Sequence, residues 1–128
     1  AYLDGSLGRL VSPGAAPSVH AAVRARAETR AESLVAGVEA LRDRPDRTDE
    51  LAAIACPTLC LCGAEDLVTP PAEMRRMAAA IGRRDGAAGG ARYVELAGAG
   101  HLAHLEAPAP FTAAVSSFLS DVLPRSAS

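Results

Sequence analysis

With 128 residues, 49% hydrophobic and 3% aromatic, the chain is long enough for one domain with an aliphatic core. Its net charge of -2 excludes a strong electrostatic attraction to nucleic acid or anionic lipid, so we expect neither as a partner. No apolar run reaches the roughly 18–20 residues that span a bilayer, and no signal peptide is visible in these residues, so a cytoplasmic protein is expected.

The first part of the chain predicts helices. Residues 1–16 contain glycines and a proline with little periodicity and are expected to form a loop. A helix is predicted from Pro17 to about Arg30. A second helix, ending before Pro45, has apolar residues at helical spacing: Leu34, Val35, Val38 and Leu41. With a short helical turn at Leu51-Ala52, these segments predict a small helical layer.

The second part alternates strands and helices. Residues 57–62 form an apolar run closed by Gly63, which is typical of a strand buried on both faces, and residues 92–96 predict a second strand. Between them, a helix is predicted over about 71–82 from Met74, Met77, Ala78 and Ile81. A last helix is predicted from the stripe of Phe111, Ala114, Val115, Phe118, Leu119 and Val122. This order predicts a crossover unit of a parallel α/β sheet. Two strands alone leave unpaired edges, so we expect further strands outside these residues.

The three cysteines, Cys56, Cys60 and Cys62, lie within seven residues of each other. An odd, clustered set is not a disulfide framework and favours a reducing compartment. The spacing resembles a metal motif, but on a strand all three side chains would share one face, and no neighbouring His or Cys completes a tetrahedral set. We therefore expect small buried thiols, with no metal and no cofactor.

Two loops carry the candidate chemistry. Asp66 follows the first predicted strand by a few residues, and His101 follows the second at a similar offset. Because parallel strands end at the same edge of a sheet, the two side chains are expected to meet there. A carboxylate in that position accepts the imidazole N–H, fixes its tautomer and stabilises the imidazolium. Alternatively, Asp66 caps the following helix and His101 is a hydrogen-bonded core histidine.

These elements resemble the C-terminal end of the α/β-hydrolase fold. The matching pattern is Pro57-Thr58-Leu59-x-Leu61-x-Gly63-x-x-Asp66-x-x-x-Pro70, followed by Gly98-x-Gly100-His101-Leu102-x-x-x-Glu106-x-Pro108-x-x-Phe111 and a terminal Phe118-Leu119. Upstream, Arg44-Pro45-Asp46 with Leu51 and Ile54 resembles the end of the helical cap of small esterases and enol-lactonases. The resemblance covers about residues 38 to 122. It implies a cap portion over 1–50 and, over 51–128, the last two strands of the hydrolase sheet with their helices.

In that family the triad runs in the order Ser, acid, His. The resemblance implies that Asp66 is the acid and His101 the base, and that the nucleophile and oxyanion hole lie before residue 1. Ser6, in Asp4-Gly5-Ser6-Leu7-Gly8, only faintly suggests a nucleophile elbow and is expected to be a loop residue, because no strand can precede it. The isolated segment is therefore expected to be inactive.

The implied function is hydrolysis of an ester, lactone or related carbonyl compound, with a small-molecule substrate. Haloalkane dehalogenases, C–C hydrolases, perhydrolases and cofactor-free oxygenases use the same scaffold and remain alternatives, as does a hydrolase-like protein without catalysis. Among neighbouring residues, Glu65 is expected to be solvated and Glu106 to anchor the histidine loop. His104 is expected near the site or at the surface, and His20 at the surface.

Overall fold

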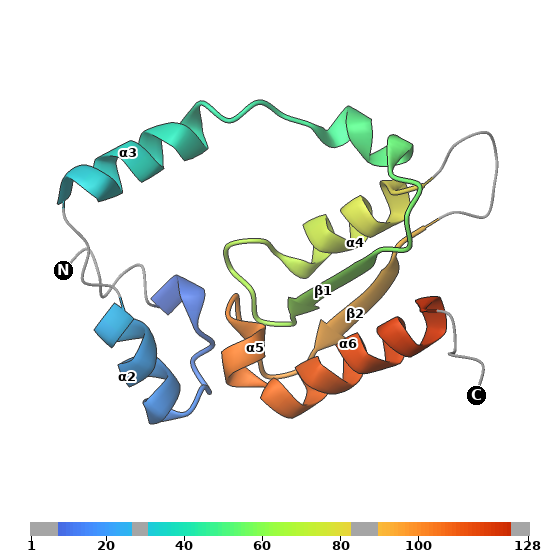
Figure 1. Cartoon of the computed structure of the whole chain (residues 1–128). Helices are drawn as coiled ribbons and strands as arrows, with labels where there is room; N and C mark the ends of the chain where they lie inside the picture. Colours follow the sequence, from blue (N-terminus) through green and yellow to red (C-terminus); the bar gives the residue numbers. More distant parts are fainter. Residues whose placement is uncertain (1–7, 27–30, 83–89, 124–128) are drawn as a thin grey trace.

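A computed structural model describes residues 8–26, 31–82 and 90–123. Figure 1 shows the helices and strands in chain order. They are α2 (Pro17–Arg26), α3 (Ala31–Arg42), the 3-10 helix η1 (Thr48–Ala53), β1 (Leu59–Gly63), α4 (Pro71–Ala80), β2 (Arg92–Leu96), α5 (Ala103–Glu106) and α6 (Pro108–Val122). The alternation of strand and helix that the sequence predicts is confirmed, and α5 is an additional turn of helix directly after the histidine loop.

β1 and β2 form a parallel pair connected by α4. The register runs from Leu59 opposite Arg92 to Gly63 opposite Leu96, so the two strands end side by side. In the part of the chain that the structure describes, the sheet has these two strands. The mixed α/β architecture with a parallel sheet is therefore as predicted, and its carboxyl edge lies at Gly63 and Leu96.

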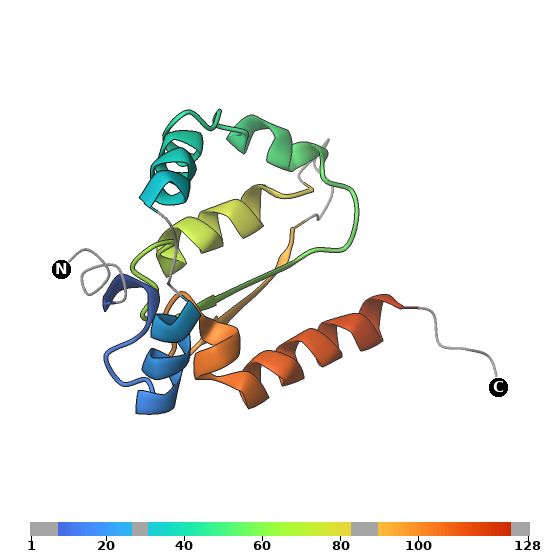
Figure 2. The same cartoon turned by 60° about the vertical axis from the view of Figure 1, so that its left-hand side comes forward.

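The sheet is covered on both faces, α4 lying on one side and α6 on the other in both views (Figures 1 and 2). On the α4 side, Cys60 is buried with Ala78 and Ile81. On the α6 side, Leu96 is buried with two small residues of the following segment, and Leu61, Val94 and Phe111 pack against them. Because successive side chains of a strand point to opposite faces, the apolar run in β1 supplies both cores.

Prolines set the boundaries of these elements. Pro71 and Pro108 occupy the first turns of α4 and α6. Backbone N–H groups in the first turn of a helix have no partner within the helix, so proline costs no hydrogen bond there. The first strand begins at Leu59, two residues later than predicted, since Pro57 has no N–H for a sheet ladder. At its other end α4 stops at Ala80, followed by extended Ile81 and by Gly82 at a φ of 70°.

The prediction of a loop over residues 1–16 is wrong in part. Residues 8–10 are helical, and the two residues that follow, Val11 and Ser12, are 3% and 1% exposed. They are buried because they pack behind the segment that carries His101, a contact between residues more than 80 positions apart. Periodicity in a short window carries no signal for such a contact.

Helix α3 stands away from the sheet in both views (Figures 1 and 2). Its apolar residues fall on the spacing the sequence shows, yet Val35, Val38 and Leu41 are 58%, 53% and 71% exposed. The side chain of Leu34 lies outside those described. The amphipathic helix is thus present as predicted, and its apolar stripe is open to solvent.

Candidate active site

The loops after β1 and β2 are joined by backbone hydrogen bonds beyond the end of the sheet. The N–H of Ala64 donates to the carbonyl of Leu96 at 2.8 Å, and the N–H of Glu65 donates to the carbonyl of Ala99 at 2.9 Å. The ladder therefore continues by two bonds into the loops. As a result, the positions of Asp66 and His101 relative to each other are set by main-chain contacts as well as by their side chains.

Glycine is required at the crossing of these loops. A Cβ added to Gly63 would overlap the carbonyl oxygens of Ala99 and Gly100. Gly98 adopts a φ of 68°, in the left-handed region that other residues rarely occupy. The backbones thus approach each other more closely than a side chain at position 63 allows.

Asp66 is 4% exposed, and its carboxylate oxygens lie among hydrogen-bond donors. Oδ1 accepts the N–H of Val68 at 2.8 Å and the N–H of Thr69 at 2.9 Å. Oδ2 accepts the hydroxyl of Thr69 at 2.7 Å and lies 3.0 Å from Nδ1 of His101. The carboxylate therefore organises its own loop and contacts the histidine at the same time. It does not cap α4, whose first residue is Pro71 and whose N-cap, Pro70, makes no side-chain hydrogen bond.

The pKa of Asp66 lies below its ordinary value. Burial acts against ionisation, but the N–H of Thr69, the imidazole of His101, the hydroxyl of Thr69 and the N–H of Val68 together outweigh it. An ionised carboxylate only accepts hydrogen bonds, so Nδ1 of His101 is the donor in this pair. When the ring is neutral, Nε2 is then its basic nitrogen. This is the tautomer that a general base requires if it is to take a proton through Nε2.

The imidazole of His101 is partly open to solvent. Its side chain is 32% exposed, whereas that of Asp66 is 3% exposed. The hydroxyl of Thr69 also lies 3.4 Å from Nδ1, so the ring is held on its Nδ1 side by Asp66 and Thr69, two residues of the loop after β1. An arrangement with one ring edge anchored and the side chain still accessible permits proton transfer to a bound molecule.

Two residues of this cluster were not singled out from the sequence. Thr69 could have been found from its local position, since a hydroxyl residue three positions after an aspartate often shares a turn with it. Ser12 could not, because its partners are Gly98 and Glu106, which are 86 and 94 residues away. Glu106, which the sequence predicts as an anchor of the histidine loop, accepts the N–H of Gly100 at 3.0 Å.

The other candidate residues lie apart from the pair. Glu65 and His104 are exposed, and His104 packs edge-on against Phe111 with ring centroids 6.0 Å apart. His20 is half-buried on α2. Ser6 lies outside the described residues.

The cysteines do not converge on one point. Cys60 and Cys62 are buried in β1, where burial raises the pKa of both thiols, and Cys56 is exposed before the strand. Across residues 8–26, 31–82 and 90–123, no three His, Cys, Asp or Glu side chains are grouped so that they can hold a metal ion. In those same ranges, no helix has the length and apolar character needed to cross a membrane.

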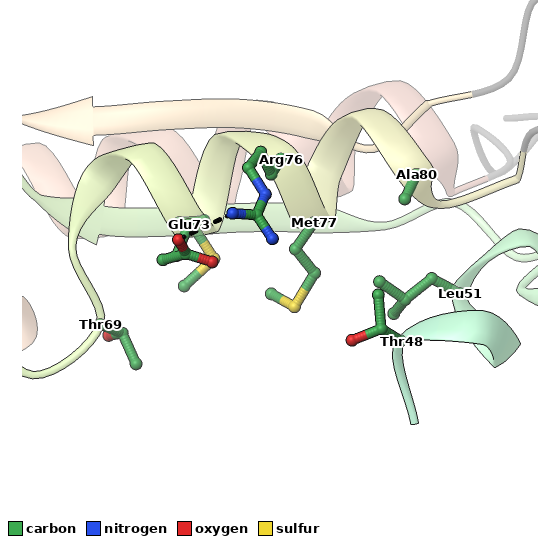
Figure 3. Close-up of a pocket in the computed structure, with 8 residues that line it drawn as sticks. Thr48, Leu51, Thr69, Glu73, Arg76, Met77 and Ala80 are labelled. Carbon is green, nitrogen blue, oxygen red and sulfur yellow. Dashed lines mark hydrogen bonds and ion pairs between the residues drawn. The ribbon is translucent and has the colours of Figure 1, made fainter. Parts of the chain in front are cut away.

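A pocket of about 370 Å³ opens between η1 and α4 (Figure 3). Leu51, Met74, Met77 and Ala80 supply its apolar lining, and Thr48, Thr69, Glu73 and Arg76 its polar lining. Glu73 and Arg76 form an ion pair at 3.0 Å within it. Thr69 connects the pocket to the candidate pair, because the same residue contacts Asp66 and His101.

The parallel crossover, the two crossing loops and the Asp–His pair at their ends give the chain the fold of the C-terminal part of an α/β-hydrolase. A solved structure of a thermophilic esterase from Thermogutta terrifontis, with malate bound, is similar to it at a TM-score of 0.81 and 31% sequence identity. The similarity covers 94% of this chain and 43% of the esterase chain, so these residues span less than half of that protein. No protein-family model and no curated protein matches the sequence.

Proposed function

We propose that this chain provides the acid and the base of a Ser-His-Asp triad in a hydrolase that acts on an ester, lactone or related carbonyl substrate. The observation that carries the proposal is the 3.0 Å contact between Nδ1 of His101 and Oδ2 of the buried Asp66. The 31% identity to an esterase over nearly the whole chain supports the same class of reaction. No cofactor or metal takes part in this chemistry.

In the proposed mechanism, a serine from residues outside this segment attacks the substrate carbonyl. His101 takes the hydroxyl proton through Nε2 and then returns it to the leaving group. Asp66 holds the tautomer through Nδ1 and stabilises the imidazolium. The oxyanion hole also comes from residues outside this segment. Residues 1–50 belong to a cap over the site and residues 51–128 to the hydrolase core in this proposal.

The test is a hydrolysis assay of the full-length protein on an activated p-nitrophenyl ester, with His101→Ala compared with His104→Ala. His104 is the matched control because it is an exposed histidine three residues away whose ring packs edge-on against Phe111. We expect His101→Ala to abolish turnover and His104→Ala to retain it. Equal activity of the His101 variant and the native protein would refute the proposal.

The same preparation separates the alternative chemistries. A serine-directed phosphonate should inactivate the protein, and substrate should protect the protein from this inactivation, as expected of a serine nucleophile. Release of halide from a haloalkane, with no ester turnover, would instead identify an aspartate nucleophile and a dehalogenase. A protein that shows neither activity but still binds a carbonyl ligand would be a non-catalytic relative.

A further inference from the structure

Glu106 lies behind the loop that carries His101 and ties this loop to a distant segment. Its Oε2 accepts the N–H of Gly100 at 3.0 Å and the N–H of Ser12 at 2.7 Å. Gly100 directly precedes His101, whereas Ser12 lies 94 residues from Glu106 in the sequence. A single carboxylate oxygen thus fixes the backbone that bears the imidazole to the N-terminal part of the chain.

Two more contacts hold the histidine loop against the same segment. The hydroxyl of Ser12 donates to the carbonyl of Gly98 at 3.3 Å, and the N–H of Leu102 donates to the carbonyl of Leu10 at 3.2 Å. They lie on either side of His101 along the chain. Since Ser12 is only 1% exposed, water has little access to compete for these bonds.

The backbone at Gly100 is closely packed against Ser12 and Glu106. A Cβ at Gly100 would stand 2.8 Å from the nitrogen of Ser12 and 3.2 Å from Oε1 of Glu106. Oε1 is itself buried and has no hydrogen-bond partner among the described residues. Burying a carboxylate oxygen without a partner is costly, so an apolar side chain would be the cheaper way to fill this space. The presence of a carboxylate at position 106 is better explained by Oε2, which accepts hydrogen bonds from two N–H donors.

We propose that Glu106 is a positioning residue for His101: through Oε2 it clamps the backbone N–H of Gly100 to that of Ser12 and so sets the place of the imidazole opposite Asp66. This inference rests on the proposed function, because positioning the imidazole affects catalysis only if His101 transfers protons. The required property is the reach of one acceptor oxygen to two donors. The negative charge is not required.

Two substitutions separate reach from charge in the full-length protein. Glu106→Gln keeps the length of the side chain and one oxygen that accepts both N–H groups, but it removes the charge. Glu106→Asp keeps the charge and shortens the side chain by one methylene, so that one oxygen no longer reaches both donors. The matched controls are Glu65→Gln and Glu65→Asp, at an exposed glutamate in the neighbouring loop whose side chain has no hydrogen bond to any described residue.

We expect Glu106→Asp to lower kcat by about tenfold to a hundredfold with KM within about twofold, because small displacements of a catalytic group cost rate. Glu106→Gln should stay within about threefold of the native kcat, and both Glu65 variants within about twofold. The downfield NMR signal of the Nδ1 proton of His101 gives a readout besides activity. It should persist in Glu106→Gln and broaden or shift in Glu106→Asp.

Two results would overturn the inference. One is a Glu106→Asp protein with native kcat and a native Nδ1 signal, even if its thermal midpoint falls, since Glu106 would then only stabilise the fold. The other is Glu106→Asp more active than Glu106→Gln, which would make the charge the important property. If His101→Ala left activity unchanged, the proposed function itself would fail, and the Nδ1 signal would still decide whether Glu106 positions the ring.

Discussion

The hydroxyl of Thr69 donates to the same oxygen of Asp66, Oδ2, that accepts the Nδ1 proton of His101. The N–H of Thr69 meanwhile donates to Oδ1, so one residue holds both oxygens of the carboxylate. With both oxygens engaged, rotation of the carboxylate away from the imidazole would break hydrogen bonds to a charged group, which are worth about 1.5–3 kcal/mol each. Thr69 therefore sets the plane in which Asp66 meets His101.

Removing this hydroxyl should impair the pair. We expect Thr69→Val to lower kcat of the full-length protein by about tenfold, the equivalent of about 1.4 kcal/mol, because the carboxylate loses one of its fixed partners. Thr69→Ser should restore most of the rate, since it returns the hydroxyl. Thr112→Val is the control, on the exposed side of α6. Steady-state kinetics on one ester substrate measure all three, and a native kcat in Thr69→Val would contradict the prediction.

The two members of the pair should differ in the cost of their loss. His101→Ala removes the proposed base and should lower kcat by about 10⁴-fold or more. Asp66→Asn keeps the imidazole but favours the wrong tautomer, and it should lower kcat somewhat less, on the order of 10³–10⁴. The double variant should be little worse than His101→Ala, because the two groups act as a unit. If Asp66→Asn kept kcat within about twofold of native, a different acid would be the partner of His101.

Acid should destabilise the protein partly through Asp66. The pKa of this group is lower in the folded protein than its ordinary value of 3.8, so the unfolded chain binds the proton first as pH falls. The stabilisation is present above about pH 4 and is lost as pH falls below 3.8 through the folded pKa. Thermal midpoints at pH 7 and pH 3 measure it, and the fall between them should be smaller in Asp66→Asn than in the native protein.

Asp43 gives the matched control for this pH dependence. Its pKa is also lowered, by its ion pair with Arg42, but both side chains are more than 60% exposed. Solvent and salt screen such a pair, so Asp43→Asn should change the fall in thermal midpoint less than Asp66→Asn does. Equal effects of the two substitutions would mean that the buried contacts of Asp66 contribute no more to the acid sensitivity than the exposed pair of Asp43 does.

Substitution by alanine should change the stability of the protein in opposite directions at Gly63 and Gly37. Gly63→Ala places a methyl group on the carbonyl oxygens of Ala99 and Gly100, and we expect it to destabilise the protein by at least the 1–3 kcal/mol that is typical of about one excess methyl group in a packed site. Gly37→Ala lies in α3, where, outside the helix's own backbone, no described atom is within 4 Å of the added group, and it should stabilise the helix by about 0.5–1 kcal/mol. Chemical denaturation measures both. Similar stabilities of the two variants would show that the loops are not closely packed.

The 128-residue chain made alone should expose apolar surface. Val35, Val38 and Leu41 are more than half exposed on α3, so we expect binding of a hydrophobic dye and a broad thermal transition with a mainly helical circular dichroism spectrum. Replacing all three residues with glutamine should reduce dye binding and keep the helix, because glutamine has a high helix propensity. A sharp transition with no dye binding would contradict this prediction.

The main features of the fold follow from local patterns in the sequence. Apolar runs ended by glycine mark β1, helical spacing marks α4 and α6, and parallel strands of matched length bring Asp66 and His101 to one edge. The contacts that Ser12 makes were not predictable, since nothing near Ser12 in the sequence points to Gly98 or Glu106, and its burial is a result of tertiary packing. The strand boundary at Leu59 and the turn of α5 likewise depend on hydrogen bonds that apolar spacing does not encode.

The continuation of the β1–β2 ladder into the loops has a consequence for building chimaeras of the α/β-hydrolase fold. If the loop after β1 or the loop after β2 were exchanged alone, the new backbone would have to re-form the hydrogen bonds from the N–H groups of Ala64 and Glu65 to the carbonyls of Leu96 and Ala99. The transferable module is therefore the continuous stretch from Leu59 to Glu106. A recipient scaffold must also present two backbone groups at the places of Leu10 and Ser12. Without them, the grafted loop has the right side chains but lacks the hydrogen bonds that hold its backbone in place.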